Sequence, residues 1–279
     1  MSPDAGSFFE NFAISTRLFR RTPLADAVRR IAAAGFRWVE LWSDGCHVDP
    51  RHELDVPALA RLMRELGIGA HSVHTPFGGL ELGHPVHCDG PASRSLIAAA
   101  IERAADLGAR IAVVHPNSYE GPLDPLLHAA SRDEARAIVG AALEAAQRCG
   151  VRVAIENMVG VGYWRFGTSL AELVEAFPDP RIGFCLDVGH ATVQGLDIVS
   201  EVSAAGDRLA HLHVHDNDGR RDQHLPPLRG IIRWADLDRA LERVGYRGRR
   251  VLEIAFQKGA EDALLKEAST LWRRWPAGA

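Results

Sequence analysis

Short apolar runs alternate with longer amphipathic segments along the whole chain. The short runs are rich in Val, Ile and Leu and span about four to eight residues, which is typical of buried strands. They predict strands at Phe12–Thr16, Trp38–Trp42, Ala70–Thr75, Ile111–His115, Val151–Asn157, Ile182–Val188, Leu209–His215 and Val251–Phe256. The longer segments repeat apolar residues at three- and four-residue spacing, as a helix with one buried face does. They predict helices at Leu24–Ala34, Pro57–Leu66, Ser93–Leu107, Arg132–Cys149, Leu170–Phe177, Asp197–Ala205, Trp234–Val244 and Glu261–Arg273.

Glycine marks the point where many of the helical patterns end. A glycine can adopt the left-handed conformation that closes a helix, because it has no Cβ atom to clash. A predicted strand follows within a few residues of each of Gly35, Gly67, Gly108, Gly150, Gly206 and Gly245. The repeated order of helix, glycine, turn and strand indicates parallel strands joined by right-handed crossovers.

Eight such units predict a closed (β/α)8 TIM barrel. The rival is an open doubly wound sheet, which usually carries a glycine-rich phosphate loop after its first strand. The segment after Phe12–Thr16 contains no glycine, and no proline- or serine-rich linker divides the chain. We therefore expect one domain over residues 1–279, with a barrel core at about 12–275.

The composition narrows the class of protein. The 279 residues are 47% hydrophobic and 24% charged, with a net charge of −4, which does not favour a nucleic-acid or membrane surface. No apolar run is long enough to cross a bilayer, and the N-terminus does not resemble a signal peptide, so we expect a cytoplasmic protein. The four cysteines form no CxxC pair, which argues against a disulfide scaffold or a thiolate zinc site.

Polar residues gather at the ends of the predicted strands, where TIM barrels place their active sites. His, Asp and Glu dominate, and these are the ligands that Zn²⁺, Mn²⁺ and Mg²⁺ accept. Converging carboxylates would repel one another without a cation, so the pattern predicts a metal site. The residues concerned are His71, His74, His115, Glu156, Asp187, His190, His211, His213, His215, Asp222, His224 and Glu253.

Alternation along a strand adds a geometric expectation. His211, His213 and His215 should point to one side of their strand, and the lowest of them is expected in the core or beside a ligand. Asp187 has a second interpretation, as the cap of the turn that follows it. Glu156 and Glu253 each follow a buried-looking apolar run, where an unpaired carboxylate would be costly.

These residues lie in segments that resemble a known family. The segments VVHPNS, AIENMVG, CLDVGHATVQG, HVHDNDG, DQHLPP and VLEIAF resemble the xylose isomerase-like TIM barrels, from about Phe12 to Phe256. This superfamily includes sugar-phosphate isomerases, ketose 3-epimerases, inosose dehydratases and endonuclease IV. The opening segment, with a helix before VEL, looks like the isomerase branch. The usual PPGxG turn is replaced here by Pro226-Pro227-Leu228-Arg229-Gly230.

The resemblance implies two alternative ligand sets. In the epimerases one divalent metal is held by residues that match Glu156, Asp187, His213 and Glu253. In endonuclease IV three zinc ions are held by residues that match His74, His115, Glu156, Asp187, His190, His213, Asp222, His224 and Glu253. All nine residue types are present in this chain.

The resemblance predicts an enzyme, a sugar or sugar-phosphate isomerase/epimerase that transfers a proton through a metal-stabilised enediolate. It implies Glu156 and Glu253 as catalytic base and acid, a Mn²⁺, Zn²⁺, Mg²⁺ or Co²⁺ cofactor, and a sugar or polyol substrate. His190, Arg229 and Trp42 are candidate substrate contacts. Further candidates are Phe77, Trp164 and Phe256 as apolar walls and Arg17 and Arg220 as anion-binding groups.

Two alternative functions stay open. One is a trinuclear zinc phosphodiesterase of the endonuclease IV type, which would need His74, His115 and His224 as ligands. Another is a barrel that binds a metal or sugar without turnover. The oligomeric state is also open, and a homo-oligomer is compatible with such a barrel.

Overall fold

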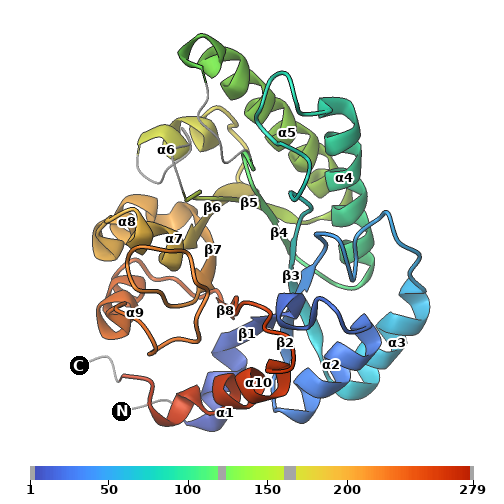
Figure 1. Cartoon of the computed structure of the whole chain (residues 1–279), viewed down its shortest axis with the longest axis vertical. Coiled ribbons are helices and arrows are strands. Elements are labelled where there is room, and N and C mark those ends of the chain that lie inside the picture. The colour runs from blue at the N-terminus through green and yellow to red at the C-terminus, as the bar shows by residue number, and fades with distance from the viewer. Residues whose placement is uncertain (1–3, 119–123, 160–167, 277–279) are drawn as a thin grey trace.

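The computed structural model describes residues 4–118, 124–159 and 168–276, which form one closed barrel (Figure 1). Its strands are parallel and neighbour one another in chain order, with the last strand pairing with the first. The predicted single-domain (β/α)8 TIM barrel is therefore confirmed. The strands are β1 (Phe12–Ser15), β2 (Trp38–Trp42), β3 (Gly69–His74), β4 (Ile111–Val114), β5 (Arg152–Glu156), β6 (Ile182–Asp187), β7 (Leu209–Val214) and β8 (Arg250–Leu252).

Helices surround the barrel (Figure 1). They are α1 (Ala5–Asn11), α2 (Leu24–Ala33), α3 (Val56–Leu66), α4 (Gly90–Asp106), α5 (His128–Cys149), α6 (Thr168–Glu175), α7 (Val188–Val193), α8 (Ile198–Ala205), α9 (Trp234–Arg243) and α10 (Glu261–Ser269). Short 3-10 helices are η1 (Thr16–Phe19), η2 (Pro125–Leu127), η3 (Gly206–Arg208) and η4 (Leu271–Arg273). Among the described helices, none combines the length and apolar character needed to span a membrane.

Helix α3 shows how the local sequence defines each unit. Asp55 caps its first turn by accepting the backbone N–H of Ala58 at 2.9 Å, and Pro57 lies in that turn, where no backbone donor is needed. Leu59 and Met63, one turn apart, are buried on the face toward the barrel. The helix ends at Gly67, whose φ of 66° is left-handed as the sequence predicts.

The parallel register brings the ends of neighbouring strands together. In β6 and β7 the Cα partner of Asp187 is His213, so the two side chains leave the sheet at one level. Most positions of the strands are buried, because side chains fill the barrel on the inside and helices cover it on the outside. The polar ends of β5 to β8 therefore lie around one rim.

Some elements differ from the sequence-based prediction. Helix α1 was not predicted, because its seven residues are too short for a clear period; its Phe8 stacks on Phe12 with ring centroids 4.1 Å apart. Helix α7 was also not predicted, and it begins directly after Asp187. Strand β8 has three residues, so Glu253 follows the strand, while its backbone N–H still donates to the carbonyl of Val214 at 3.3 Å.

Candidate metal centre

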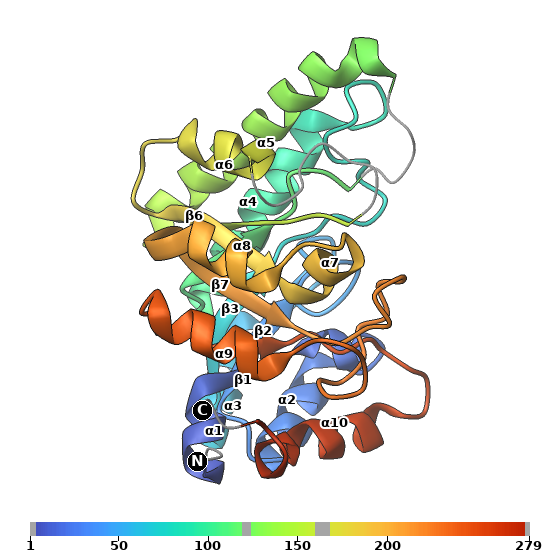
Figure 2. The same ribbon diagram turned by 90° about the vertical axis from the view of Figure 1, so that its left-hand side faces the viewer.

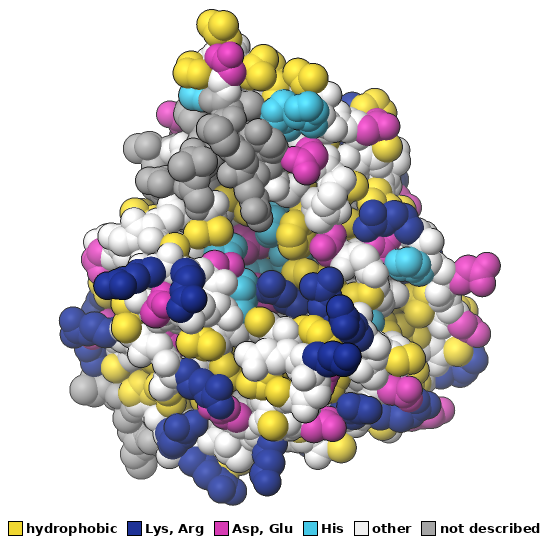
Figure 3. Space-filling view, in the orientation of Figure 1, with side chains coloured by type: hydrophobic (Ala, Val, Ile, Leu, Met, Phe, Trp, Pro, Cys, Tyr) yellow, Lys and Arg dark blue, Asp and Glu magenta, His cyan; other side chains and the backbone are white. Residues whose placement is uncertain are grey.

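A cavity of about 670 Å³ opens at the C-terminal ends of the strands. Figure 3 shows this hollow near the centre of the face, with His and acidic side chains inside it and basic side chains around its border. In the side view of Figure 2, α7 and the long orange segment between β7 and α9 project on the same side of the barrel. Residues at or just after most of the strand ends line the cavity, so this rim is the candidate site for binding and catalysis.

Four residues of the predicted epimerase-type set converge at this rim. Glu156, Asp187, His213 and Glu253 each offer a ligand atom, and these atoms lie within 4.8 Å of one another. His213 Nδ1 lies 3.4 Å from Glu156 Oε1, 3.8 Å from Asp187 Oδ2 and 3.3 Å from Glu253 Oε2. All four side chains are almost completely buried. The structure thus brings together residues that are far apart in the sequence.

Three more groups of ligand atoms adjoin this set, and one of them, formed by Cys185, His211 and His213, shares His213 with it. His74 and His115 direct Nε2 at Glu156 Oε2, at 3.3 and 3.0 Å, so Glu156 belongs to two groups. A third group surrounds Asp222, whose Oδ2 lies 3.4 Å from His190 Nε2 and 2.9 Å from His224 Nε2. The third group consists of His190, His215, Asp222 and His224. All nine residues of the larger predicted set therefore lie at this one centre.

Backbone carbonyls fix the orientation of three imidazoles. Nδ1 of His74 faces the carbonyl of Thr75 at 3.0 Å, and Nδ1 of His190 faces that of Asn157 at 2.8 Å. His224 Nδ1 faces the carbonyl of Glu253 at 2.8 Å. A carbonyl only accepts, so each Nδ1 donates, and Nε2 is the atom that can offer a lone pair to a metal ion when the ring is neutral. Metal-binding histidines typically have this arrangement.

The charges of the centre are strongly coupled. Burial disfavours the carboxylate of Glu156, but His115 and His213 outweigh it and hold the pKa of Glu156 well below its usual range. Burial likewise disfavours the imidazolium of His190, but Asp187 and Asp222 outweigh it and raise the pKa of His190 well above its usual value. The carboxylates of this centre are thus held in their ionised form by neighbouring imidazoles.

The donor set fits a divalent metal ion. Carboxylate oxygens and imidazole nitrogens converge from strand ends, and their atoms are near enough to share one ion. Glu253 Oε2 is buried and has no hydrogen-bond partner among the described residues, although buried polar atoms are normally paired. A metal ion at this position would satisfy that oxygen and offset the repulsion between the three carboxylates.

Asp187 has both of the roles that the sequence suggested. Its Oδ1 accepts the backbone N–H of His190 at 2.7 Å, which caps α7. A carboxylate oxygen of Asp187 also lies 2.9 Å from His215 Nε2. Asn157 fixes the backbone beside it, because its amide accepts from Asp187 N at 2.7 Å and donates to Asp187 O at 3.0 Å. The cap and the candidate ligand are two oxygens of one side chain.

The segment after β7 is held over the centre by Asp216. This buried carboxylate accepts the backbone N–H groups of Leu228 at 3.0 Å and Ile232 at 3.2 Å, and the indole N–H of Trp234 at 3.1 Å. Leu228, which stands where the family turn has its first glycine, keeps a left-handed φ of 73°. Gly230 has no room for a Cβ atom, which would lie 2.7 Å from the backbone nitrogen of Asn217. The turn therefore has a left-handed backbone at Leu228 although that position carries no glycine.

Only some of the predicted substrate contacts line the cavity. Trp42, Phe77 and Arg220 line it, and so does Arg17, whose Nη1 donates to Glu253 Oε1 at 3.0 Å. Arg229 is not among the lining residues; its Nε donates to Glu267 Oε1 at 2.8 Å.

One predicted apolar wall lies away from the cavity. Phe256 does not line the cavity, and the guanidinium of Arg21 lies 5.3 Å from its ring centroid. Trp164 lies outside the described residues.

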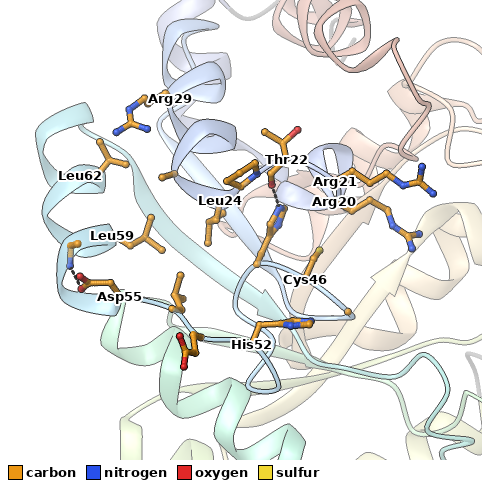
Figure 4. Close-up of a pocket in the computed structure, with 17 residues that line it drawn as sticks. Arg20, Arg21, Thr22, Leu24, Arg29, Cys46, His52, Asp55, Leu59 and Leu62 are labelled. Carbon is orange, nitrogen blue, oxygen red and sulfur yellow. Dashed lines mark hydrogen bonds between the residues drawn. The ribbon is translucent and has the colours of Figure 1, made fainter.

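A second groove, of about 680 Å³, lies between η1 and α2 on one side and the segment from β2 to α3 on the other. Its apolar floor includes Leu24, Leu59 and Leu62, while Arg20 and Arg21 extend together at one end (Figure 4). None of the ligand groups found in the described part of the chain includes a residue of this groove. It therefore lacks the concentration of acidic groups and imidazoles that marks the central cavity.

Sequence reasoning missed Glu40, whereas it included His215 among the metal-site candidates on the same side of the strand as His213. Glu40 Oε2 lies 3.0 Å from His211 Nε2 and 3.1 Å from His213 Nε2. The signal for Glu40 was present, because it follows the same kind of apolar run as Glu156 and Glu253. The signal for His215 was its position two residues after His213, which places both on one side of the strand.

Comparison with known proteins identifies the family. The model of the xylose isomerase-like TIM barrel family matches residues 28–275. The chain belongs to the xylose isomerase-like TIM barrel family. An uncharacterized protein of Methanocaldococcus jannaschii is 26% identical over 245 residues, which cover 85% of this chain and 81% of that protein. A probable endonuclease 4 of Oleidesulfovibrio alaskensis is 32% identical over 206 residues, covering 63% of this chain and 65% of the relative.

A solved structure has the same architecture. A D-tagatose 3-epimerase-like protein superposes with a TM-score of 0.79 at 24% identity, covering 95% of this chain and 97% of the other. At this identity the likeness shows the shared barrel. The resemblance noted in the sequence motifs is thus confirmed at the level of the xylose isomerase-like family.

Proposed function

We propose that this protein is a divalent-metal-dependent isomerase or epimerase of a small sugar or polyol. The observation that carries the proposal is the pair of buried carboxylates, Glu156 and Glu253, that share a ligand group with Asp187 and His213. This group borders a cavity of about 670 Å³, a volume suited to a small molecule. Structural similarity to a D-tagatose 3-epimerase-like protein supports the same class of reaction.

The chemistry requires removal of a proton from a carbon atom next to a carbonyl. A bound divalent ion supplies Lewis acidity, which lowers the cost of the negative charge that develops on the substrate oxygens. Glu156 comes from β5 and Glu253 from the end of β8, and these strands are not neighbours in the barrel. The two carboxylates therefore approach the cavity from different parts of the rim. In the reacting state one carboxylate is ionised and removes the proton as a general base, while the other is protonated and returns its proton as a general acid.

Other residues of the cavity support this role for the carboxylates. Burial disfavours the carboxylate of Glu253, but His213, His224 and Arg17 outweigh it and lower the pKa of Glu253. Arg17 also donates a hydrogen bond to Glu253 Oε1. Glu253 is thereby kept ionised and ready to accept a proton. Trp42 and Phe77 form an apolar wall that limits water around the reacting atoms. His190 presents Nε2 toward the cavity, where it can contact a substrate hydroxyl.

The test combines metal analysis with a proton-exchange assay. Ketoses, inososes and their phosphates are incubated in D₂O with metal-loaded protein, and conversion and deuterium incorporation are followed by NMR. Glu156→Gln and Glu253→Gln should each lower conversion by about 100-fold or more, because one carboxylate cannot do both proton transfers. Each variant should still exchange the proton of one epimer, since one base remains.

Asp238 provides the matched control. It is a buried carboxylate on α9 that accepts from Arg250 Nε at 2.9 Å and Trp275 Nε1 at 2.6 Å, outside the ligand groups. Asp238→Asn should leave conversion unchanged in the fraction that folds. Near-normal conversion by both glutamine variants would refute the two-carboxylate scheme.

A second candidate function is metal-dependent phosphodiester hydrolysis. The observation that favours it is that three of the ligand groups, including His74, His115 and His224, lie at one centre. The probable endonuclease 4 relative points to the same chemistry. The number of ions separates the candidates: one ion per chain favours the isomerase and three favour the hydrolase. Cleavage of DNA that contains an abasic site would establish the nuclease.

A further inference from the structure

A carboxylate lies beneath the candidate metal centre, on the side away from the cavity. Glu40 belongs to β2, is completely buried, and is not among the residues that line the cavity. It belongs to none of the ligand groups found in the described chain. Glu40 therefore contacts the candidate ligand His213 from below the rim and does not itself line the cavity.

One oxygen of Glu40 accepts all of its hydrogen bonds. Oε2 lies 2.9 Å from Ser72 Oγ, 3.0 Å from His211 Nε2 and 3.1 Å from His213 Nε2. Oε1 has no hydrogen-bond partner among the described residues. Three side chains from two other strands therefore hold this one oxygen in place.

The contact with His213 determines which ring nitrogen carries the proton. An ionised carboxylate only accepts hydrogen bonds, so His213 must donate Nε2–H to Glu40. In the neutral ring Nδ1 then carries the lone pair. Nδ1 is also the atom that faces Glu156, Asp187 and Glu253, at 3.3 to 3.8 Å.

We propose that Glu40 is a positioning residue that holds His213 in the tautomer and orientation in which Nδ1 binds the metal ion. This inference rests on the metal site of the proposed function. Ser72 and His211 complete the arrangement, because they fix the Glu40 oxygen at the level of His213. Without Glu40, the buried Nε2–H of His213 would have no acceptor, and the ring could turn or change tautomer.

The first experiment measures metal affinity. Protein stripped of metal is titrated with Zn²⁺ in competition with a chromophoric chelator. Glu40→Met removes the acceptor at nearly constant volume and should weaken zinc binding by about 10- to 100-fold, as loss of a hydrogen-bond partner of a ligand histidine typically does. Glu40→Gln keeps an oxygen acceptor and should restore most of the affinity. The absorption spectrum of the Co²⁺ protein should change with Glu40→Met and return toward wild type with Glu40→Gln.

Asp238→Asn is again the matched control, since it perturbs a buried carboxylate that contacts no candidate ligand. It should keep wild-type zinc affinity. Equal zinc affinity and equal Co²⁺ spectra for wild type and Glu40→Met would overturn the inference and leave the metal site standing. Absence of zinc binding by the wild type would instead overturn the proposed function, and the inference with it.

If Glu40→Met does not fold, a second measurement tests the role of Glu40. The ¹⁵N and ¹H signals of His213 in the zinc-loaded wild-type protein report the tautomer directly. The expected result is a protonated Nε2 and a metal-bound Nδ1. A metal-bound Nε2 would overturn the inference.

Discussion

A substitution at Gly189 tests whether His215, a member of the third ligand group, orients Asp187. It lies in α7, and a Cβ atom added there would overlap the ring of His215 and lie 2.6 Å from its Nε2. Ordinary contacts between heavy atoms are about 3.5 Å or longer, and Cε1 of the ring is closer still than Nε2, so the ring must move by about 1.5 Å. The hydrogen bond between His215 Nε2 and Asp187, now 2.9 Å, would then exceed the useful range. Gly189→Ala therefore displaces His215 without substituting any residue of the ligand groups.

The expected effect has two parts. Overpacking should lower the free energy of unfolding by about 1–3 kcal/mol. Loss of the His215 contact leaves Asp187 less well oriented and should weaken metal binding by about 10- to 100-fold. The assay is zinc titration against a chelator, with thermal unfolding of the metal-free protein measured in parallel.

Gly140 in α5 is the control, because a Cβ atom there meets its nearest neighbour, Phe177, at an ordinary 3.7 Å. Gly140→Ala should keep metal affinity and raise stability by roughly 0.5–1 kcal/mol through better helix propensity. If Gly189→Ala bound zinc as tightly as the Gly140→Ala control, His215 would have no part in the centre.

Two further predictions concern protonation and the segment after β7. Because acidic neighbours outweigh burial and raise the pKa of His190 and His213 well above the usual value, both should be protonated in the metal-free protein at pH 7. Metal binding requires neutral rings, so it should release protons, and the metal affinity should increase as pH rises. Calorimetry in buffers of different ionisation enthalpy would measure the number of protons released. No proton release would refute this charge assignment. Asp216→Ala leaves several buried donors without an acceptor and should lower the free energy of unfolding by about 3–5 kcal/mol in denaturant titrations. A loss below about 1 kcal/mol would show that Asp216 does not hold this segment.

The barrel was predictable from the sequence because its signals are local. Glycines at helix ends, such as Gly67 and Gly150, fixed the boundaries of repeated units, and both adopt the left-handed conformation in the structure. Short elements were not predictable in the same way. Helix α7 depends on a cap by Asp187, and that residue can be read equally well as the end of a strand. A pattern of a few residues cannot separate these two interpretations.

The candidate site was predictable in its residue types and only partly in its contacts. Glu156, Asp187 and Glu253 could be named because each follows a buried strand. Glu40 has the same local pattern, but its role depends on His211 and His213, which are more than 170 residues away in the chain. Arg229 illustrates the opposite case, because its pairing with Glu267 of α10 has no local signal. Such contacts are set by tertiary packing rather than by sequence spacing.

The central claim is that Glu156, Asp187, His213 and Glu253 bind one divalent ion. Anomalous diffraction from crystals of the protein saturated with Mn²⁺ or Zn²⁺ tests it most directly. The account predicts a peak about 2.0–2.6 Å from carboxylate oxygens of the three acidic residues and from His213 Nδ1. A saturated crystal with no peak within about 4 Å of these atoms would contradict it.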